Sequence, residues 1–334
     1  QYPGFAGFLY SKSRLFVRIF HLVLAVGYTI LLSRKVKIDA VHGWNPLAGL
    51  AAVLSKKILG CQVFVDLTDF YSDIAKTDSP SMVSFFNFIE RYILSAAEKV
   101  VVVSTVMRDF LSQYYNVSKD KIYIIPDGTD KEKFNPLVDG TKVRNSYMLG
   151  SNPTLIYHGD IKSPDGVDIL LEAFKLVLKK IPNAKLLIVG GGGSYFQRLK
   201  IHAKNLKRSV IFAGWVPHEA VPEYIAASDL GVMPLRSTLN HNCYVSFKLF
   251  EYWGVGKPVV VSGVKAISEI VRNGINGVLV KPEDVKSLAD GILAVLNDLG
   301  KARLMGDNGR RLVEEKYNWN SLMVTEAKLY KIKK

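Results

Sequence analysis

The amino-acid sequence predicts an α/β protein with two domains, each built on a parallel sheet. Short apolar runs such as Val100–Val103 and Val259–Val261 are typical of strands buried on both faces, as the strands of parallel sheets are. Segments with apolar residues at helical spacing follow such runs, an alternation typical of strand–helix–strand units. A chain of 334 residues is long enough for two domains of ordinary size.

The segment that begins at Ser246 shows this alternation most clearly. Ser246 is a suitable N-cap for the apolar-periodic helix behind it, and Pro258 prevents that helix from restarting after its glycine-rich end. The runs Val259–Val261 and Val278–Val280 are then strands, with a short helix between them. This arrangement fixes one carboxylate, Glu251, on a helix beside a tight glycine turn.

Two motifs in this segment resemble a known family. The pattern K-L-F-E-Y-x-x-x-G-K-P-V-V, which begins at Lys248, and the pattern S-E-I-V-x-x-G-x-N-G-x-L-V, which begins at Ser268, are similar to the donor-binding core of the family 4 retaining glycosyltransferases. The resemblance implies the GT-B fold, in which two Rossmann-like domains with parallel sheets face each other across a cleft. It also implies that Glu251 holds the ribose of a nucleotide-sugar donor, and that backbone N–H groups at Val245 and Ser246 face its phosphates. A helix N-terminus favours an anion on physical grounds as well.

Further motifs extend the resemblance over nearly the whole chain. Residues 125–136 resemble the P-N-G-V-D-x-x-x-F-x-P signature at the end of the family's first domain, with two positions that differ. After the first strand of the second domain, Gly159 would allow close approach of the backbone to the donor. The resemblance places the loop with Trp215 and Val216 against the nucleotide base.

In the donor-binding part of the second domain, the chain departs from the family pattern at three positions. Where the family usually has an Arg and a Lys that bind the donor diphosphate, this chain has Asp160 and Asp165. Two desolvated carboxylates there would repel a diphosphate, so we expect Lys162 and Lys248 to replace the missing cations; a weaker grip on the diphosphate is the alternative. Cys243 stands where many relatives have a second Glu, although a subgroup with S-x-K-L-F-E-Y also lacks that Glu.

Polar residues follow two predicted strands of the first domain, at the edge where ligands of parallel sheets collect. These candidates for the cleft wall are His42, Trp44, Thr68 and Asp69. In many relatives the position of Thr68 is a histidine that contacts the transferred sugar and is followed by an Asp. Thr68 departs from that pattern, so only Asp69 is carried over as a catalytic residue. A lone histidine after a strand is more often structural than functional, and both interpretations of His42 stay open.

Residues 13–33 form the first strong element, a helix with a basic and polar stripe on an otherwise apolar surface. Its uncharged run is shorter than the roughly 20 apolar residues that a membrane span needs. Two interpretations stay open, namely a basic amphipathic helix on a membrane surface and a packing helix of the first domain. The basic residues that follow the helix favour the membrane: Arg34, Lys35 and Lys37.

The composition limits the classes of function. A net charge of +14 implies an anionic partner, such as a phosphorylated ligand or an acidic membrane. The basic excess is spread over both halves of the chain, unlike the concentrated stripe of a nucleic-acid-binding protein. Cys61 and Cys243 give neither a zinc spacing nor a disulfide framework, which suits a reducing cytosol. No carboxylate pair is arranged for a metal, so we expect no metal and no cofactor; the nucleotide-sugar is a substrate.

Together these observations predict an acceptor-side domain in residues 1–146, a nucleotide-sugar-binding domain in residues 147–316, and a C-terminal helix in residues 317–334 that crosses back to the first domain. Family 4 enzymes normally open with a buried strand and a Gly-rich loop, so we expect a fragment that lacks its first β-α units. The predicted activity is retaining transfer of a hexose from a nucleotide-diphospho-sugar to a membrane-associated glycan or lipid, at the cytosolic face of a membrane. The residues assigned to catalysis are Lys248, Lys162 and Asp69.

Two alternatives remain open. One is a non-catalytic GT-B partner subunit that binds nucleotide without turnover, suggested by Asp160, Asp165 and Cys243. The other is a nucleotide-sugar epimerase of the same fold, which needs no acceptor. A Rossmann dehydrogenase is disfavoured, because no G-x-G-x-x-G motif opens a helix with an acidic residue about 20 positions further on.

Overall fold

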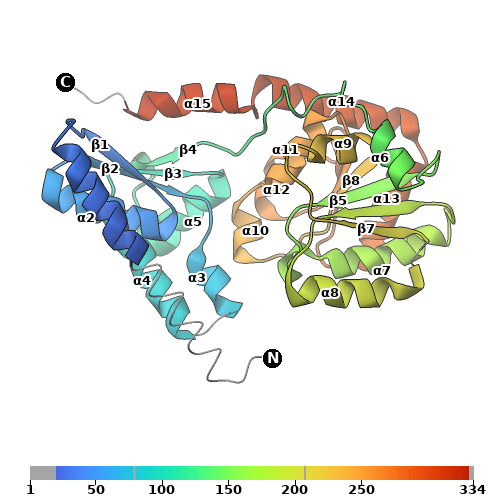
Figure 1. The fold of residues 1–334 in the computed structure, drawn as a ribbon, viewed down its shortest axis with the longest axis horizontal. Coiled ribbons are helices and arrows are strands. Elements are labelled where there is room, and N and C mark those ends of the chain that lie inside the picture. The colour runs from blue at the N-terminus through green and yellow to red at the C-terminus, as the bar shows by residue number, and fades with distance from the viewer. Residues whose placement is uncertain (1–19, 78–79, 207, 331–334) are drawn as a thin grey trace. The chain divides into compact units, whose positions relative to one another are not determined.

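The computed structural model describes residues 20–77, 80–206 and 208–330, and the chain divides into two units. Unit 1 comprises residues 1–125 together with 326–334, and unit 2 comprises residues 126–325. Each unit is built on its own parallel sheet with helices packed around it (Figure 1). The two parallel α/β sheets are those that the sequence predicts.

The sheet of unit 1 has four strands in the order β1-β2-β3-β4. They are β1 (Ala40–Trp44), β2 (Gln62–Leu67), β3 (Lys99–Val102) and β4 (Ile122–Ile124). The connecting helices are α2 (Asn45–Leu59), α3 (Tyr71–Ile74), α4 (Pro80–Ala96) and α5 (Thr105–Tyr115), with 3-10 turns η1 (Ala75–Thr77) and η2 (Lys119–Lys121). The three valines of β3 are buried, which is why this strand is an apolar run in the sequence.

Residues 20–33 are helical and form the described part of the predicted helix; residues 13–19 lie outside the described chain. The helix presents large apolar side chains to solvent, each more than half exposed: Phe20, Val23, Leu24, Tyr28 and Leu31. Their spacing places them on one helix face. The basic residues after the helix are exposed as well, so this part of unit 1 combines an apolar face with positive charge.

The sheet of unit 2 has six strands in the order β10-β9-β8-β5-β6-β7. They are β5 (Thr154–His158), β6 (Lys185–Val189), β7 (Val210–Gly214), β8 (Leu230–Met233), β9 (Val259–Ser262) and β10 (Val278–Val280). The helices are α6 (Thr141–Ser146), α7 (Val167–Leu178), α8 (Gly193–His202), α9 (Val221–Ala226), α10 (Leu239–Cys243), α11 (Phe247–Gly254), α12 (Lys265–Ile270), α13 (Val285–Leu296), α14 (Leu299–Glu315) and α15 (Trp319–Ala327). The 3-10 turns η3 (Ser163–Asp165) and η4 (Ala203–Leu206) lie in this unit, and η5 (Lys328–Tyr330) lies in unit 1.

This strand order creates a switch point between β5 and β8. From β5 the chain adds β6 and β7 on one side, and it then returns to add β8, β9 and β10 on the other. Crossovers that leave in opposite directions open a crevice at the carboxyl ends of the strands, where ligands of open α/β sheets bind. The topology of unit 2 thus predicts where its ligand site lies.

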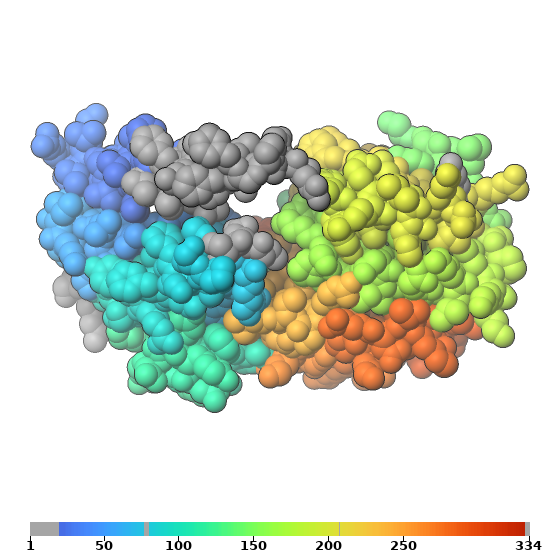
Figure 2. All heavy atoms as spheres, turned by 90° about the horizontal axis from the view of Figure 1, so that it is seen from below, coloured from blue at the N-terminus to red at the C-terminus, as the bar shows by residue number. Residues whose placement is uncertain are grey.

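Helix α8 illustrates how the outer layer of unit 2 is built. Its inward side chains Phe196 and Leu199 are buried, whereas Arg198 and Lys200 are exposed. The helix lies on the face of unit 2 that Figure 2 shows, in yellow-green to yellow. Its basic residues are therefore a solvated helix face.

The units divide after residue 125, whereas the sequence analysis placed the boundary at 146. Segment 126–146 belongs to unit 2 because two arginines hold it there. The first is Arg310 on α14, whose Nη1 lies between 2.8 and 3.1 Å from three backbone carbonyl oxygens, those of Lys131, Phe134 and Gly254.

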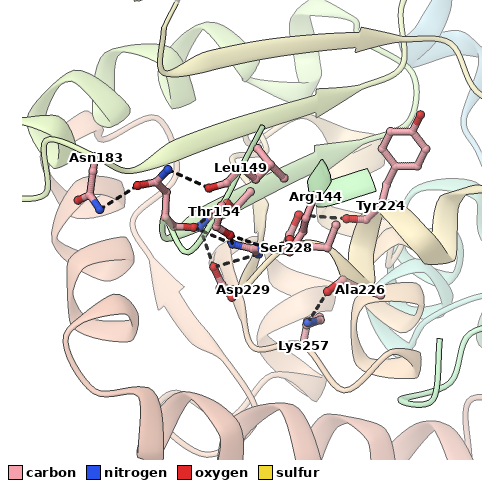
Figure 3. A network of polar contacts seen from close by, with 12 residues as sticks. Arg144, Leu149, Thr154, Asn183, Tyr224, Ala226, Ser228, Asp229 and Lys257 are labelled. Carbon is pink, nitrogen blue, oxygen red and sulfur yellow. Dashed lines mark hydrogen bonds and ion pairs between the residues drawn. The ribbon is translucent and has the colours of Figure 1, made fainter. Parts of the chain in front are cut away.

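The second is Arg144 on α6 (Figure 3). Its guanidinium donates hydrogen bonds to the carbonyl oxygens of Gly150, Asn152 and Ala227. It also lies 3.9 Å from Asp229 Oδ2, an atom that accepts a hydrogen bond from the backbone N–H of Thr154 at the start of β5. Segment 126–146 is therefore tied to the start of β5, a central strand of the second sheet.

Residues 326–330, at the end of the described chain, pack on unit 1. The ring of Tyr330 lies 5.3 Å from the ring of Phe64 on β2, and Lys99 donates a hydrogen bond to the carbonyl oxygen of Leu329. Helix α15 therefore begins in unit 2 and ends in unit 1.

Candidate functional site

A cavity of 720 Å³ opens in unit 2 at the carboxyl ends of β5, β6 and β7. Its position is the one that the switch point predicts. Residues at the ends of these strands line it together with the first turns of α11 and the segment that follows the unit boundary. The lining residues include Lys133, His158, Gly159, Asp160, Gly190, Gly191, Trp215, Val216, His218, Ser246, Phe247, Lys248, Glu251 and Trp319.

Glu251 is the buried carboxylate of this cavity, with 6% of its surface exposed. Helix α11 carries it, and the aromatic neighbours Tyr252 and Trp253 anchor that helix because both are fully buried. Burial alone would raise its pKa, but the hydrogen bond from His218 and the positive charges of His218 and Lys248 hold the pKa of Glu251 below its usual value. Glu251 is therefore an ionised carboxylate in a largely desolvated place.

His158, the last residue of β5, lies on one side of Glu251. Its Nε2 is 3.3 Å from Glu251 Oε2, a close contact whose geometry is not that of a hydrogen bond. Burial, more than any charge, lowers the pKa of His158 to about 4. The imidazole is therefore neutral at pH 7, and it packs in the core against the Glu251 carboxylate.

His218 lies on the other side of Glu251, in the loop before α9. Its Nε2 is 2.7 Å from Glu251 Oε1, and its Nδ1 is 3.0 Å from Lys133 Nζ. The hydrogen bond with Glu251 is the main reason that the pKa of His218 is raised, although burial opposes it. Unlike His158, this side chain is 59% exposed.

Each lysine that the sequence analysis assigned to the diphosphate is paired with an aspartate. Lys248 Nζ lies 3.4 Å from Asp165 Oδ1, and both side chains are nearly buried. Lys162 Nζ lies 2.8 Å from Asp160 Oδ2, and both of these side chains are exposed. The two aspartates that depart from the family pattern are thus compensated, but neither lysine is an isolated cation.

The N-terminus of α11 points at the cavity through Ser246 and Phe247. Ser246 occupies the predicted N-cap position, but its side chain makes no capping hydrogen bond. The first N–H groups of a helix have no acceptor within the helix, and they carry a partial positive charge. This helix end is therefore suited to an anionic ligand group.

Most of the predicted donor residues meet at the cavity. Its lining contains Glu251, Gly159, Ser246, Trp215, Val216 and Lys248. Val245 is buried and Lys162 is not among the lining residues. Sequence reasoning missed His158 and His218; the position of His158 at the end of a strand beside the switch point was a usable signal, whereas no sequence pattern indicated His218.

The predicted acceptor-side residues lie in unit 1. Asp69 follows the carboxyl end of β2, next to Thr68, whose N–H and hydroxyl both donate to Asn45 Oδ1. The buried carboxylate of Glu90 accepts hydrogen bonds from the N–H and the hydroxyl of Ser72 and thereby holds α3, the helix that follows this loop. Asp69 is thus held at a strand end by two anchors.

His42 lies in the middle of β1 rather than after it. It contacts Tyr330, and its Nδ1 lies 3.6 Å from Glu326 Oε1. Burial lowers the pKa of His42, and burial together with the nearby Glu326 raises the pKa of Asp66 to about 7. These contacts make His42 part of the attachment of the C-terminal segment, which is the structural interpretation.

The described part of the chain contains neither a candidate metal site nor a candidate membrane-spanning helix. Within residues 20–77, 80–206 and 208–330, no group of three or more His, Cys, Asp or Glu side chains could hold a metal ion. Within the same ranges, no helix combines the length and the apolar character needed to cross a membrane.

Two family models match the sequence, one in each half. The model described as "Glycosyltransferase Family 4" matches residues 8–133. The model described as "Glycosyl transferases group 1" matches residues 152–298. The second range contains the cavity residues from His158 to Glu251.

Individual proteins of known name are similar over most of the chain. A GDP-mannose-dependent alpha-(1-6)-phosphatidylinositol monomannoside mannosyltransferase of Mycobacterium tuberculosis is 27% identical over 248 residues, which is 72% of this chain and 64% of that protein. The chain spans 60% to 64% of the length of the first curated relatives it matches.

Solved structures match the fold. Sucrose-phosphate synthase from Thermosynechococcus elongatus superposes with a TM-score of 0.78 and 25% identity, covering 91% of this chain and 76% of that one. The Anabaena protein HepE, solved in complex with UDP-glucose, superposes with a TM-score of 0.77 and 19% identity, covering 91% of this chain and 81% of that one.

Proposed function

Because the chain belongs to glycosyltransferase family 4 and has the GT-B fold, we propose that it transfers a hexose from a nucleotide-diphospho-sugar, with retention of configuration, to a membrane-associated glycan or lipid. The observation that carries the proposal is Glu251, an ionised and buried carboxylate at the wall of a 720 Å³ cavity. A carboxylate that is kept ionised while largely desolvated is a strong acceptor for hydroxyl groups. The ribose diol of a nucleotide donor supplies such hydroxyls.

The other lining residues fit the remaining parts of such a donor. The α11 N-terminus and Lys248 would face the diphosphate, and Gly159 lets the backbone approach it. Trp215 is 78% exposed at the cavity wall, so its ring is available to stack on a nucleobase. Catalysis would then rest on positioning and on stabilising the departing diphosphate in the cavity.

The similar proteins indicate the class of donor and acceptor. One acts on a phosphatidylinositol mannoside with GDP-mannose, and another binds UDP-glucose. We therefore include UDP and GDP hexoses as donors and a glycolipid as acceptor. Asp69 would face the acceptor side. The apolar face of residues 20–33 and the basic residues behind it would rest on an anionic membrane surface.

The test is calorimetric titration of the protein with UDP-glucose and with GDP-mannose. We expect one of them to bind, with affinity lost in Glu251→Gln, because the amide keeps the shape but not the charge that receives the ribose hydroxyls. Glu315→Gln is the matched control, since Glu315 is exposed on α14 and is not among the lining residues. Equal affinity in Glu251→Gln and Glu315→Gln would refute the assignment of the donor site.

Turnover distinguishes the proposal from its two alternatives. Release of UDP or GDP that depends on a glycolipid acceptor supports a transferase. Binding of the nucleotide sugar without release of UDP or GDP, whichever acceptor is added, supports a partner subunit. The pairing of Lys248 with Asp165 is the observation that favours this alternative. Conversion of the free sugar nucleotide without acceptor supports an epimerase.

A further inference from the structure

Both oxygens of Glu251 lie against histidine nitrogens, and the two histidines differ in burial. His158 is held in the core with 5% of its side chain exposed, whereas the side chain of His218 is 59% exposed. Glu251 lines an open cavity, yet its own side chain is only 8% exposed. The imidazole of His218 therefore covers the carboxylate on the side from which a ligand would reach it.

The partners of His218 define the tautomer of its neutral ring. Lys133 Nζ lies 3.0 Å from His218 Nδ1 and 3.8 Å from Glu219 Oε1. An ammonium group can only donate, so Nδ1 accepts and Nε2–H donates to Glu251 when the ring is neutral. Protonation of the ring would turn the neutral hydrogen bond to Glu251 into an ion pair, and it would push Lys133 away from Nδ1.

We propose that His218 is a positioning residue that covers Glu251 in a proton-dependent manner and must move aside when the nucleotide donor binds. The inference rests on the proposed function, because the group that replaces His218 on Glu251 is the ribose diol of the donor. In its protonated form His218 is attracted to Glu251 as a full charge, so it competes more strongly with the donor. Its exposed position in a loop permits the movement.

The charged neighbours determine the direction of the pH effect. Glu251 and Glu219 favour the protonated form of His218, and Lys133 opposes it. His158, with a pKa of about 4, stays neutral throughout the neutral range, and Glu251 stays ionised. The pKa of His218 is raised while it covers Glu251, and it falls when the donor displaces it. Donor binding therefore releases a proton, and affinity falls as the pH is lowered through the pKa of His218.

The experiment measures donor affinity against pH, with a variant and a matched control. UDP-glucose and GDP-mannose are titrated calorimetrically at about pH 6, 7 and 8 in buffers of different ionisation enthalpy. These donors carry no terminal phosphate that titrates near pH 6, unlike UDP and GDP. One linked proton changes an affinity by at most about tenfold per pH unit, so we expect the wild type to bind severalfold more weakly at the lowest pH and to release protons on binding.

His218→Gln should remove both effects and should bind more tightly than the wild type at about pH 6. His202→Gln is the control, because His202 on α8 is also a half-exposed histidine paired with a carboxylate, that of Glu172, and is not among the cavity-lining residues. It should keep the pH dependence of the wild type. A purely structural role for His218 would not make the observed binding enthalpy depend on the ionisation enthalpy of the buffer, which is the signature of proton release on binding.

Three outcomes overturn the inference, and they differ in what else they refute. If the wild type binds the donor with the same affinity at every pH, the proposed proton-dependent covering of Glu251 by His218 is refuted, whereas the donor site itself is not. Weaker binding by His218→Gln at every pH shows that His218 holds the donor instead. Absence of binding to the wild type and to His218→Gln alike refutes the proposed function, and the inference with it.

Discussion

Gly159 offers a test of the site in which backbone strain and ligand binding can be separated. Its φ of +113° is one that residues with a Cβ rarely adopt, and an added Cβ would lie 2.4 Å from Lys248 Cε and 3.3 Å from Lys248 Nζ. Gly192 has a similar φ of +122°, but a Cβ there would meet no atom within 4 Å. Gly159→Ala and Gly192→Ala therefore share the strain and differ in the displacement of Lys248.

The expected magnitudes follow from these two contributions. Backbone strain at such a φ costs about 1–3 kcal/mol, so both variants should lose about that much free energy of unfolding. Displacing the Lys248 side chain also disturbs its nearly buried pair with Asp165, so Gly159→Ala should lose somewhat more free energy of unfolding than Gly192→Ala, and the displaced ammonium group then no longer reaches the diphosphate. A hydrogen bond to a charged group contributes about 1.5–3 kcal/mol, which corresponds to a dissociation constant about 10- to 150-fold higher in Gly159→Ala.

Two measurements decide the case. Urea denaturation gives the free energy of unfolding of both variants, and calorimetry gives their affinity for the nucleotide sugar that binds the wild type. Gly192→Ala should keep the affinity of the wild type, and Gly159→Ala should add little to the loss already caused by Lys248→Ala, because both act through the same ammonium group. The reasoning is refuted if folded Gly159→Ala binds like the wild type, or if Gly192→Ala loses as much affinity.

Three further predictions concern stability. Arg144→Ala should lower the free energy of unfolding of unit 2 by about 2–3 kcal/mol, because the carbonyl groups that Arg144 contacts lose a charged donor. Denaturant titration measures this loss. The control is Lys286→Ala, which removes an exposed ion pair and should not change the free energy of unfolding measurably. Asp66, with a pKa of about 7 in the folded protein, binds more protons in the folded than in the unfolded state between about pH 4 and 7, so the free energy of unfolding of unit 1 should fall as the pH rises through that range. Hydrogen exchange of the β1 and β2 amides should show this fall, by up to about 4 kcal/mol. Asp66→Asn should abolish it. Ser104→Ala should cost about 1 kcal/mol in thermal unfolding, since the Ser104 hydroxyl caps α5, whereas Ser246→Ala, whose side chain makes no capping bond, should not.

The strands were predictable because burial on both faces leaves a local pattern. Val278–Val280 is observed as β10 with the predicted bounds, and the run at Val259 is observed as β9 with one further residue, Ser262. Both strands belong to the six-stranded sheet of unit 2, in which β9 is buried throughout, whereas β10 lies at the edge and is buried only at Val280. The assignment of residues 126–146 was less accessible, because the contacts of Arg310 and Arg144 that hold this segment join positions far apart in the sequence.

The site was predictable only where a local motif carried it. Glu251 and Lys248 share one helix turn, so the motif placed them together. His218 and Glu251 are 33 positions apart in the sequence, and Asp165 and Lys248 are 83 positions apart. No local sequence pattern indicates a contact over such separations. The sequence therefore indicated which carboxylate lines the cavity, but not that its two oxygens lie against histidine nitrogens.

The paired lysines also change the electrostatic argument about the diphosphate. Two unpaired aspartates would repel it, but Asp165 and Asp160 are each neutralised by a lysine. The exposed pair of Asp160 and Lys162 is held weakly, so a diphosphate could recruit Lys162 at little cost. The nearly buried pair of Asp165 and Lys248 is harder to break, because separation leaves a desolvated carboxylate. The α11 N-terminus needs no such release, and for this reason it is the main attraction that the cavity offers to a diphosphate.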